Sequence, residues 1–201
     1  MKGLILTFTF FTVYFFAQGQ NSGNQKAWYQ CENPEKVDST MVNREPGKIY
    51  FDFAVNETPK KPKKGQFSWL ENYPEDYFVS YLVNTTDSIF RATRQDGSLM
   101  MIQEALDEDG NWSPIEFWVH SGCGNSYFNP LELNPNECIL VPIKRYTGDF
   151  KTYVRLRFKY GNQVLFSNTF EASIDPSQFS KETDDVKGIL YYGRANYFET
   201  E

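Results

Sequence analysis

The sequence predicts an all-β protein, an antiparallel immunoglobulin-like β-sandwich of about seven to nine strands. Three observations favour this class. The chain of 201 residues contains 18 Phe, 13 Tyr and 4 Trp, and aromatic side chains bury large areas and prefer strands to helices. From Tyr77 onward, strand-like segments about 6 to 12 residues long are separated by turn residues. No segment shows a persuasive helical period.

The chain begins with a segment that predicts export. Lys2 precedes an apolar run, Leu4–Phe16, of about 13 residues, which suits a secretory signal and is too short to span a bilayer. The small residues that follow predict cleavage after Gly19. We therefore expect residues 1–19 to be a signal peptide and the mature protein to be secreted or periplasmic, with no membrane span. The alternative is a retained amino-terminal membrane anchor.

The next region, residues 20–46, is polar and runs into Glu45-Pro46-Gly47, so we expect an N-terminal segment with room for one short strand. The sandwich domain is expected to span residues 47–180. Its first strand is predicted at Ile49–Val55 from the aromatic and β-branched content. Residues 59–65 contain two prolines and four lysines, which predict an exposed loop.

The first predicted hairpin joins residues 87–94 to residues 98–106. Between them, Gln95-Asp96-Gly97 fits a three-residue loop, because such a loop places Gly in its last, left-handed position. The loop fixes three pairs: Arg94 with Ser98, Ala92 with Met100, and Phe90 with Ile102. The four apolar residues then share one face, so register and hydrophobic pattern agree.

The second predicted hairpin joins residues 151–160 to residues 163–174 across Gly161-Asn162. Along its first strand, apolar residues alternate with mostly charged ones, which is typical of a half-buried strand. A two-residue turn faces Phe158 with Leu165 but leaves Phe166 and Phe170 on the charged side. We therefore predict an odd-length loop or a bulge, with Gly161 or Asn162 at positive φ. The resulting pairs are Phe158 with Phe166 and Val154 with Phe170.

Two further strands are predicted between these hairpins. Residues 112–119 form one, and Pro114 places it at a sheet edge. Residues 137–143 form the other. The acidic C-terminal tail, residues 181–201, carries one more candidate strand at residues 188–192.

Three cysteines in an exported protein can form one internal disulfide, which leaves the third cysteine outside it. We expect the disulfide between Cys123 and Cys138, because the chain between them is short and rich in Gly, Asn and Pro. A competing interpretation pairs Cys31 with one of these two and fixes the N-terminal segment to the body. A third leaves all three as buried thiols.

Charge and composition exclude several classes of function. The chain carries 26 carboxylates against 20 Lys and Arg, a net charge of −6, which argues against nucleic-acid binding. A single His excludes a His-rich zinc site, and we expect neither a metal nor a cofactor. The acidic run Asp107–Asn111 lacks the spacing of an EF-hand loop and is predicted to be a turn with Gly110 in the left-handed region.

One loop and its neighbouring aromatic residues form the candidate binding surface. Residues 120–129 combine glycines with polar and aromatic side chains, and two Trp residues fall on one side of the strand before the loop. Flat aromatic faces suit sugar rings, although such residues also fill cores. The candidate ligand-binding residues are Trp112, Trp118, His120, Asn125, Tyr127 and Phe128. The expected partner is a glycan or an extracellular protein.

The predicted function is accordingly a secreted, non-enzymatic binding or structural module. The alternative is a secreted hydrolase that uses a carboxylate pair such as Glu104 and Glu116, which requires carboxyl groups about 5 to 9 Å apart in an open cleft. Catalysis by Cys123 with His120 is disfavoured, because the glycines beside the cysteine lack the spacing of a nucleophile elbow.

Five stretches between Asp96 and Phe179 carry a resemblance to a known group. They are DGS at 96–98, IQEA at 102–105, WSPIE at 112–116, CGNSY at 123–127 and SNTFE at 167–171. In them the chain resembles uncharacterised secreted β-sandwich proteins of Gram-negative bacteria. The resemblance implies export and an immunoglobulin-like sandwich, and it transfers no functional residue.

Overall fold

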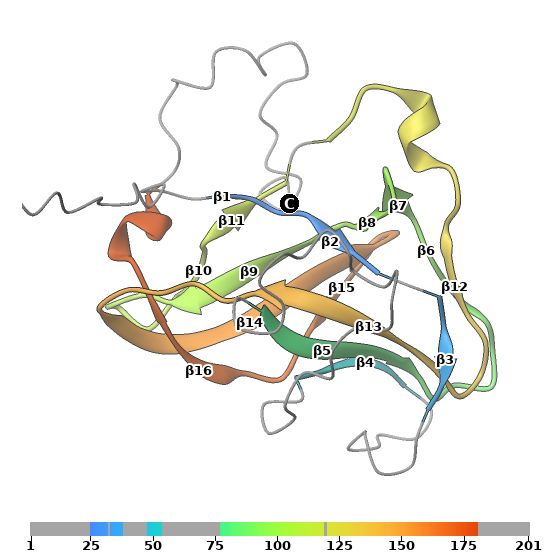
Figure 1. The fold of residues 1–201 in the computed structure, drawn as a ribbon, viewed down its shortest axis with the longest axis horizontal. Coiled ribbons are helices and arrows are strands. Elements are labelled where there is room, and N and C mark those ends of the chain that lie inside the picture. The colour runs from blue at the N-terminus through green and yellow to red at the C-terminus, as the bar shows by residue number, and fades with distance from the viewer. Residues whose placement is uncertain (1–24, 32, 38–47, 54–76, 119, 181–201) are drawn as a thin grey trace, which may run out of the picture.

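The described part of the protein is mostly β-strand, with almost no helix (Figure 1). The computed structural model describes residues 25–31, 33–37, 48–53, 77–118 and 120–180. Three predicted features lie outside the described residues: the signal peptide (1–19), the Lys-rich loop (59–65) and the acidic tail with its candidate strand (181–201). Within the described ranges, no helix has the length and apolar character needed to cross a membrane.

The largest sheet of the described residues has five strands in the order β10-β9-β14-β15, with β16 also paired to β14. They span Trp112–Pro114 (β10), Met101–Leu106 (β9), Phe150–Tyr160 (β14), Gln163–Phe166 (β15) and Phe170–Ile174 (β16). All pairings in this sheet are antiparallel. β10 lies at an edge, as Pro114 predicted, because proline has no N–H to donate to a further strand.

A second antiparallel sheet has four strands in the order β3-β13-β5-β4. They span Glu35–Lys36 (β3), Glu137–Lys144 (β13), Tyr77–Asn84 (β5) and Ile49–Phe53 (β4). β13 confirms the strand predicted at residues 137–143. β4 confirms the first predicted strand over the part of it that the structure describes.

Short strands complete the described fold. They are β1 (Gln25–Lys26) parallel to β11 (Glu116–Phe117), β6 (Phe90–Ala92) with β12 (Leu131–Leu133), and β8 (Ser98–Leu99) between β2 (Tyr29–Gln30) and β7 (Arg94–Gln95). Two single 3-10 turns, η1 (Gly124–Tyr127) and η2 (Pro176–Phe179), are the helical elements described. The predicted all-β class is confirmed.

The two larger sheets pack against each other through aromatic rings. Phe51 of β4 meets Phe158 of β14 with ring centroids 5.4 Å apart, and Phe78 of β5 meets Phe170 of β16 at 4.5 Å. These rings belong to, or pack against, one hydrophobic core that draws on both sheets. Burial of each large apolar side chain stabilises the fold by about 1.5–3 kcal/mol, so the core is the main source of stability.

The strand β14 shows the alternation that the sequence predicted. Val154, Leu156 and Phe158 are at most 1% exposed and point into the core, whereas Arg155 and Arg157 lie between them on the outer face. Period-two alternation of this kind fixes which face of a strand is buried.

The first predicted hairpin has a different turn. Its loop has two residues, Asp96 and Gly97, with φ of 51° and 83°, and Gln95 pairs with Ser98. Two central residues at positive φ match the right-handed twist of the flanking strands, and Asp-Gly is a preferred sequence for such a turn. The predicted pairing of Arg94 with Ser98 is therefore wrong by one residue.

The strands beyond that turn also separate. Phe90 and Ala92 pair with Leu133 and Leu131 of β12, not with Ile102 and Met100. The hairpin ends after Leu99, and the strand that follows, β9, pairs with β14 and β10 instead. The four apolar residues of the predicted pairs are nevertheless all buried, so burial was predicted correctly while the strand partners were not.

The second predicted hairpin is partly confirmed. Its turn has two residues, because Tyr160 pairs with Gln163, so Phe158 faces Leu165 and the odd-length loop is wrong. Gly161 takes φ of 55°, as expected. Phe166 lies opposite Arg157 on the outer face and is 43% exposed.

The predicted bulge occurs farther along the same strands. Residues 167–169 lie opposite residues 155 and 156, so one extra residue enters and Val154 pairs with Phe170 as predicted. Ser167 fills the bulge: its N–H donates to the Leu156 carbonyl at 3.1 Å, and its Oγ accepts from the Leu156 N–H at 2.8 Å. The bulge thus returns Phe170 to the core face.

The N-terminal segment belongs to the fold more fully than its polar composition predicted. Instead of one short strand it supplies three, which pair with β11, β8 and β13. Ala27 and Tyr29 are 1% and 2% exposed and lie in the core. These two apolar residues, at alternating positions, anchor the segment to the core together with its strand pairings.

The predicted disulfide between Cys123 and Cys138 is wrong, because all three cysteines are free thiols. Cys138 points from β13 into a second hydrophobic cluster on the outer face of the four-stranded sheet, beside Val83. Cys123 lies exposed just before η1. Cys31 is half-buried, with the Arg94 Nη1 3.8 Å from its Sγ, so neither alternative pairing is present.

Candidate functional site

The six candidate binding residues do not form one surface. Trp118 is 2% exposed and belongs to the core. Trp112 lies on β10, and the other four lie on the loop between β11 and β12 that contains η1. Figure 1 places β10 and the yellow η1 turn on different sides of the molecule. The loop therefore has to be considered without the two tryptophans.

The Trp112 ring packs against Arg155 on the outer face of the five-stranded sheet. The Arg155 guanidinium lies 4.2 Å from the Trp112 ring centroid and 4.0 Å from that of Phe166. Arg155 also forms an ion pair with Glu104, with Nη2 2.7 Å from Oε2. One face of the Trp112 ring is thus used inside the protein, in a cation–π contact.

The side chain of Gln95 holds the loop of residues 120–129 through hydrogen bonds. Gln95 is only 2% exposed. Its Oε1 accepts hydrogen bonds from the Ser121 N–H at 2.9 Å and from the Tyr127 hydroxyl at 3.0 Å. The Asp96 N–H donates to the Ser126 carbonyl at 2.6 Å. A buried amide and a turn of the neighbouring hairpin therefore fix both halves of the loop.

Further hydrogen bonds close the loop on itself. The Tyr127 hydroxyl lies 2.7 Å from the Ser121 carbonyl and also contacts Nδ1 of His120. The hydroxyls of Ser121 and Ser126 are 2.8 Å apart. Arg94 donates from Nε to the Asn129 carbonyl at 2.8 Å, where Asn129 adopts φ of 62°. His120 and Tyr127 thus help to build the loop, which gives them a structural role.

Phe128 is the apolar residue that this loop presents. It is 65% exposed, more than the other exposed large hydrophobic residues of the described chain, Trp28, Ile89, Tyr153 and Phe166. Asn125 is also exposed, on η1. A loop fixed by backbone and side-chain hydrogen bonds that holds an aromatic ring in water has the features of a contact surface.

The two carboxylates of the hydrolase alternative lie on opposite faces of β9. Glu104 points to the outer face and pairs with Arg155 and with Arg157, whose Nη1 is 3.3 Å from Oε1. Glu116 hydrogen-bonds to the side chain of Gln103, the preceding residue of β9, on the core face. Both carboxylates are 2% exposed, so they do not form the open pair that the alternative requires.

Glu116 is the centre of a buried polar cluster that the sequence did not reveal. Oε1 accepts from the Tyr146 hydroxyl at 2.6 Å and from Gln103 Nε2 at 3.1 Å, while Oε2 accepts from the Gln103 N–H at 2.8 Å and from the Tyr29 hydroxyl. Burial raises the pKa of Glu116 above its ordinary value, and these hydrogen bonds oppose that rise. The only signal in the sequence was a polar Gln103 between Met101 and Ala105.

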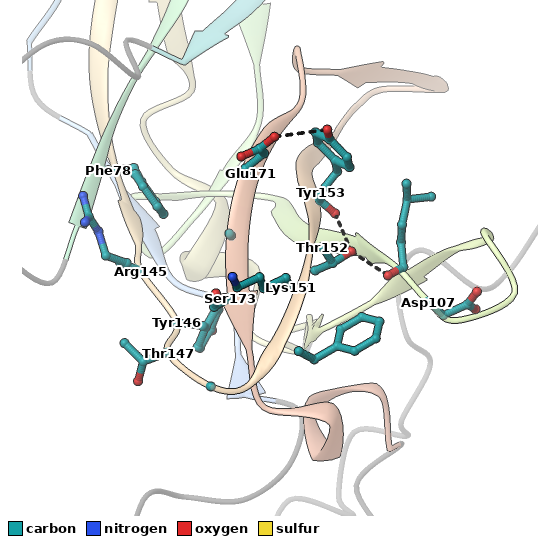
Figure 2. A pocket seen from close by; sticks show the side chains of 14 residues that line it. Phe78, Asp107, Arg145, Tyr146, Thr147, Lys151, Thr152, Tyr153, Glu171 and Ser173 are labelled. Carbon is teal, nitrogen blue, oxygen red and sulfur yellow. Dashed lines mark hydrogen bonds between the residues drawn. The ribbon is translucent and has the colours of Figure 1, made fainter.

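A surface pocket of about 870 Å³ lies beside the ends of β14 and β16 (Figure 2). The loop after β13 forms one wall with Arg145, Tyr146 and Gly148, and Phe78 of β5 lies beside Arg145. Lys151 and Glu171 line it from β14 and β16. The sequence did not predict this pocket, because its residues come from five separate segments.

The acidic run is a turn, as predicted. Gly110 takes φ of 80°, and Asp107 Oδ1 accepts hydrogen bonds from the N–H groups of Asp109 and Asn111. The backbone bond from Asn111 is the main cause of a lowered Asp107 pKa. In the part of the chain that the structure describes, no group of three or more His, Cys, Asp or Glu side chains could hold a metal ion.

Comparison of the chain with protein-family models, curated proteins and solved structures finds no match.

Proposed function

We propose that the protein is an exported, non-enzymatic binding module with an immunoglobulin-like β-sandwich as scaffold. Its contact surface is the loop of residues 120–129, and its partner is an extracellular protein. The observation that carries the proposal is the exposure of Phe128 on a loop that hydrogen bonds hold in place.

The energetics support this role. Because Phe128 is 65% exposed, covering it on binding contributes about 1–2 kcal/mol, which is about tenfold in Kd. The loop is already ordered by Gln95 and Tyr127, so little conformational entropy is lost on association. Aromatic side chains of this kind are the usual anchors of protein interfaces.

A protein partner is favoured over a glycan by the way the ring is presented. Phe128 is 65% exposed, and neither tryptophan that the sequence placed with it lies beside it, since Trp118 is in the core and Trp112 lies on the sheet. A projecting ring fills a pocket of a partner, whereas a sugar ring needs a flat platform with polar groups around it.

The test uses arrays of extracellular proteins from the source organism and arrays of glycans. They are probed with the wild-type protein, with Phe128→Ser and with Ile89→Ser. Ile89 is a matched control, because it is 44% exposed on another loop. We expect protein hits whose Kd rises about tenfold or more in Phe128→Ser and stays the same in Ile89→Ser.

Thermal unfolding of the three proteins accompanies the arrays. Phe128→Ser is expected to keep the wild-type Tm, because the side chain makes little contact with the core. Hits that bind Phe128→Ser as well as wild type contradict the proposed surface. Hits confined to the glycan array contradict the proposed partner.

A further inference from the structure

The pocket of Figure 2 lies on another part of the molecule from the proposed binding loop. In Figure 1 the ends of β14 and β16 that line it are on the left, while η1 is at the upper right. Its volume of about 870 Å³ is in the range of small-molecule sites, roughly 300–1,000 Å³.

One wall of the pocket is held rigidly. A Cβ added to Gly148 would lie 2.2 Å from the backbone carbonyl of Ile174, so the loop after β13 packs directly on the end of β16 and only glycine fits there. The next anchor is Tyr146, whose hydroxyl donates to the buried Glu116 at 2.6 Å. The backbone on both sides of Tyr146, including Arg145, is thereby placed before any ligand arrives.

Two cations of the pocket form no ion pair within the described residues. The Arg145 guanidinium stacks 4.2 Å from the Phe78 ring centroid, and neither it nor the Lys151 ammonium forms an ion pair with a carboxylate of the described residues. The lining also contains two carboxylates, which keep their negative charge: Asp107 accepts hydrogen bonds from its own turn, and Glu171 accepts one from the Tyr153 hydroxyl at 3.2 Å. Arg145 and Lys151 are therefore the groups of the pocket that can bind an anionic group of a ligand.

The remaining lining suits a hydroxylated ring. Lys151 and Ser173 are paired across β14 and β16, and Tyr153 and Glu171 form the next pair on the same face. Tyr153 is 46% exposed, so its ring offers a stacking surface, while Glu171 and Ser173 can hydrogen-bond to sugar hydroxyls. Figure 2 shows Lys151 and Ser173 between Arg145 at one end and Tyr153 at the other.

We propose that this pocket binds an acidic saccharide, a sugar chain whose rings carry carboxylates. Lys151 and Arg145 bind the carboxylates, Tyr153 packs against a ring, and Glu171 and Ser173 hydrogen-bond to hydroxyls. The site is separate from the loop of residues 120–129, so it adds a glycan contact to the proposed protein contact.

The test is calorimetric titration of the purified protein with trigalacturonate, with neutral galactotriose and with triglutamate. We expect trigalacturonate to bind at least about tenfold more tightly than the neutral sugar and the acidic peptide, with an affinity that falls as salt is added. Lys151→Met is expected to weaken trigalacturonate binding about tenfold. Lys36→Met makes the same charge change elsewhere, on β3, and is expected to leave binding unchanged.

Four outcomes overturn the proposal. They are equal affinity for the neutral sugar, equal or tighter binding of triglutamate, a Lys151→Met variant that binds like wild type, and no heat of binding for trigalacturonate up to about 10 mM. Phe128→Ser serves to separate the two sites: it should bind trigalacturonate normally, and weakened binding would show that the pocket is not independent of the loop.

Discussion

Tyr29→Phe removes one oxygen atom from the core and tests whether the N-terminal segment belongs to it. The Tyr29 side chain is 2% exposed, and its hydroxyl donates to Glu116 Oε2. Phe fills the same space, so the variant leaves packing almost unchanged. What is lost is one of the four hydrogen bonds that satisfy the buried carboxylate.

The expected cost follows from the chemistry of the acceptor. A hydrogen bond to a charged group contributes about 1.5–3 kcal/mol, against about 1 kcal/mol for a neutral pair. The Gln103 N–H, Gln103 Nε2 and Tyr146 hydroxyl still bind Glu116 in the variant, so the carboxylate keeps partners on both oxygens. We therefore expect a loss of about 2 kcal/mol, which moves a urea midpoint by about 1 M.

The assay is equilibrium urea unfolding at pH 7, followed by tryptophan fluorescence. Tyr153→Phe is the control, because it removes the same atom from a side chain that is 46% exposed and bonds only to the exposed Glu171. That control is expected to change stability by less than about 0.5 kcal/mol. If Tyr29→Phe shifts the midpoint no more than Tyr153→Phe does, the buried cluster does not contribute to stability as argued.

Three further outcomes are expected. Because burial raises the folded-state pKa of Glu116 above its ordinary value of 4.5, its contribution to stability is fully present below that pH and is lost as pH rises through the folded-state pKa. Urea unfolding at several pH values measures the difference in unfolding free energy between wild type and Glu116→Gln. This difference should fall from pH 4 to pH 7, and a constant or rising difference contradicts the prediction. Cys123 should react first with iodoacetamide in the native protein and Cys138 last, since Cys138 is 6% exposed and burial raises its pKa to about 11. Peptide mass spectrometry measures the order of labelling. The reverse order, or a disulfide between the two cysteines, refutes the prediction. Gly148→Ala should lower Tm by about 5 °C, because the added Cβ meets the backbone at the end of β16. A Cβ at Gly124 meets open space, so Gly124→Ala should leave Tm unchanged. Equal Tm values for the two variants would contradict the close approach of Gly148 to β16.

The sequence was sufficient for local features of the fold. The alternation of Val154, Leu156 and Phe158 with arginines identified β14 and its buried face. The mismatch around Phe166 revealed that an extra residue had to enter, and the bulge is there. These features depend on residues close together in the chain, so periodicity can detect them.

Strand partners far apart in the sequence could not be predicted. Phe90 suited Ile102 by position and hydrophobicity, yet it pairs with Leu133 of β12. Both pairings bury the same side chain, so the hydrophobic pattern does not distinguish them. The choice depends on turn geometry at Asp96-Gly97 and on contacts that form across the whole core.

The candidate site was predicted in part for the same reason. Trp112 and Trp118 have an even spacing that implies a common face, but a bend at Ile115 separates β10 from β11, and one ring lies on the sheet while the other is in the core. The loop of residues 120–129 could be chosen as a candidate because it is continuous in sequence. The pocket was missed because Phe78, Arg145 and Glu171 meet only after the strands assemble.

Backbone NMR relaxation tests, without any ligand, whether a rigid loop holds Phe128 in water. Residues 120–129 are expected to give order parameters of about 0.85, like the strands beside them, because the hydrogen bonds from Gln95, Asp96 and Arg94 restrain the loop. Order parameters below about 0.6 across these residues would show a flexible loop and would contradict a preformed binding surface.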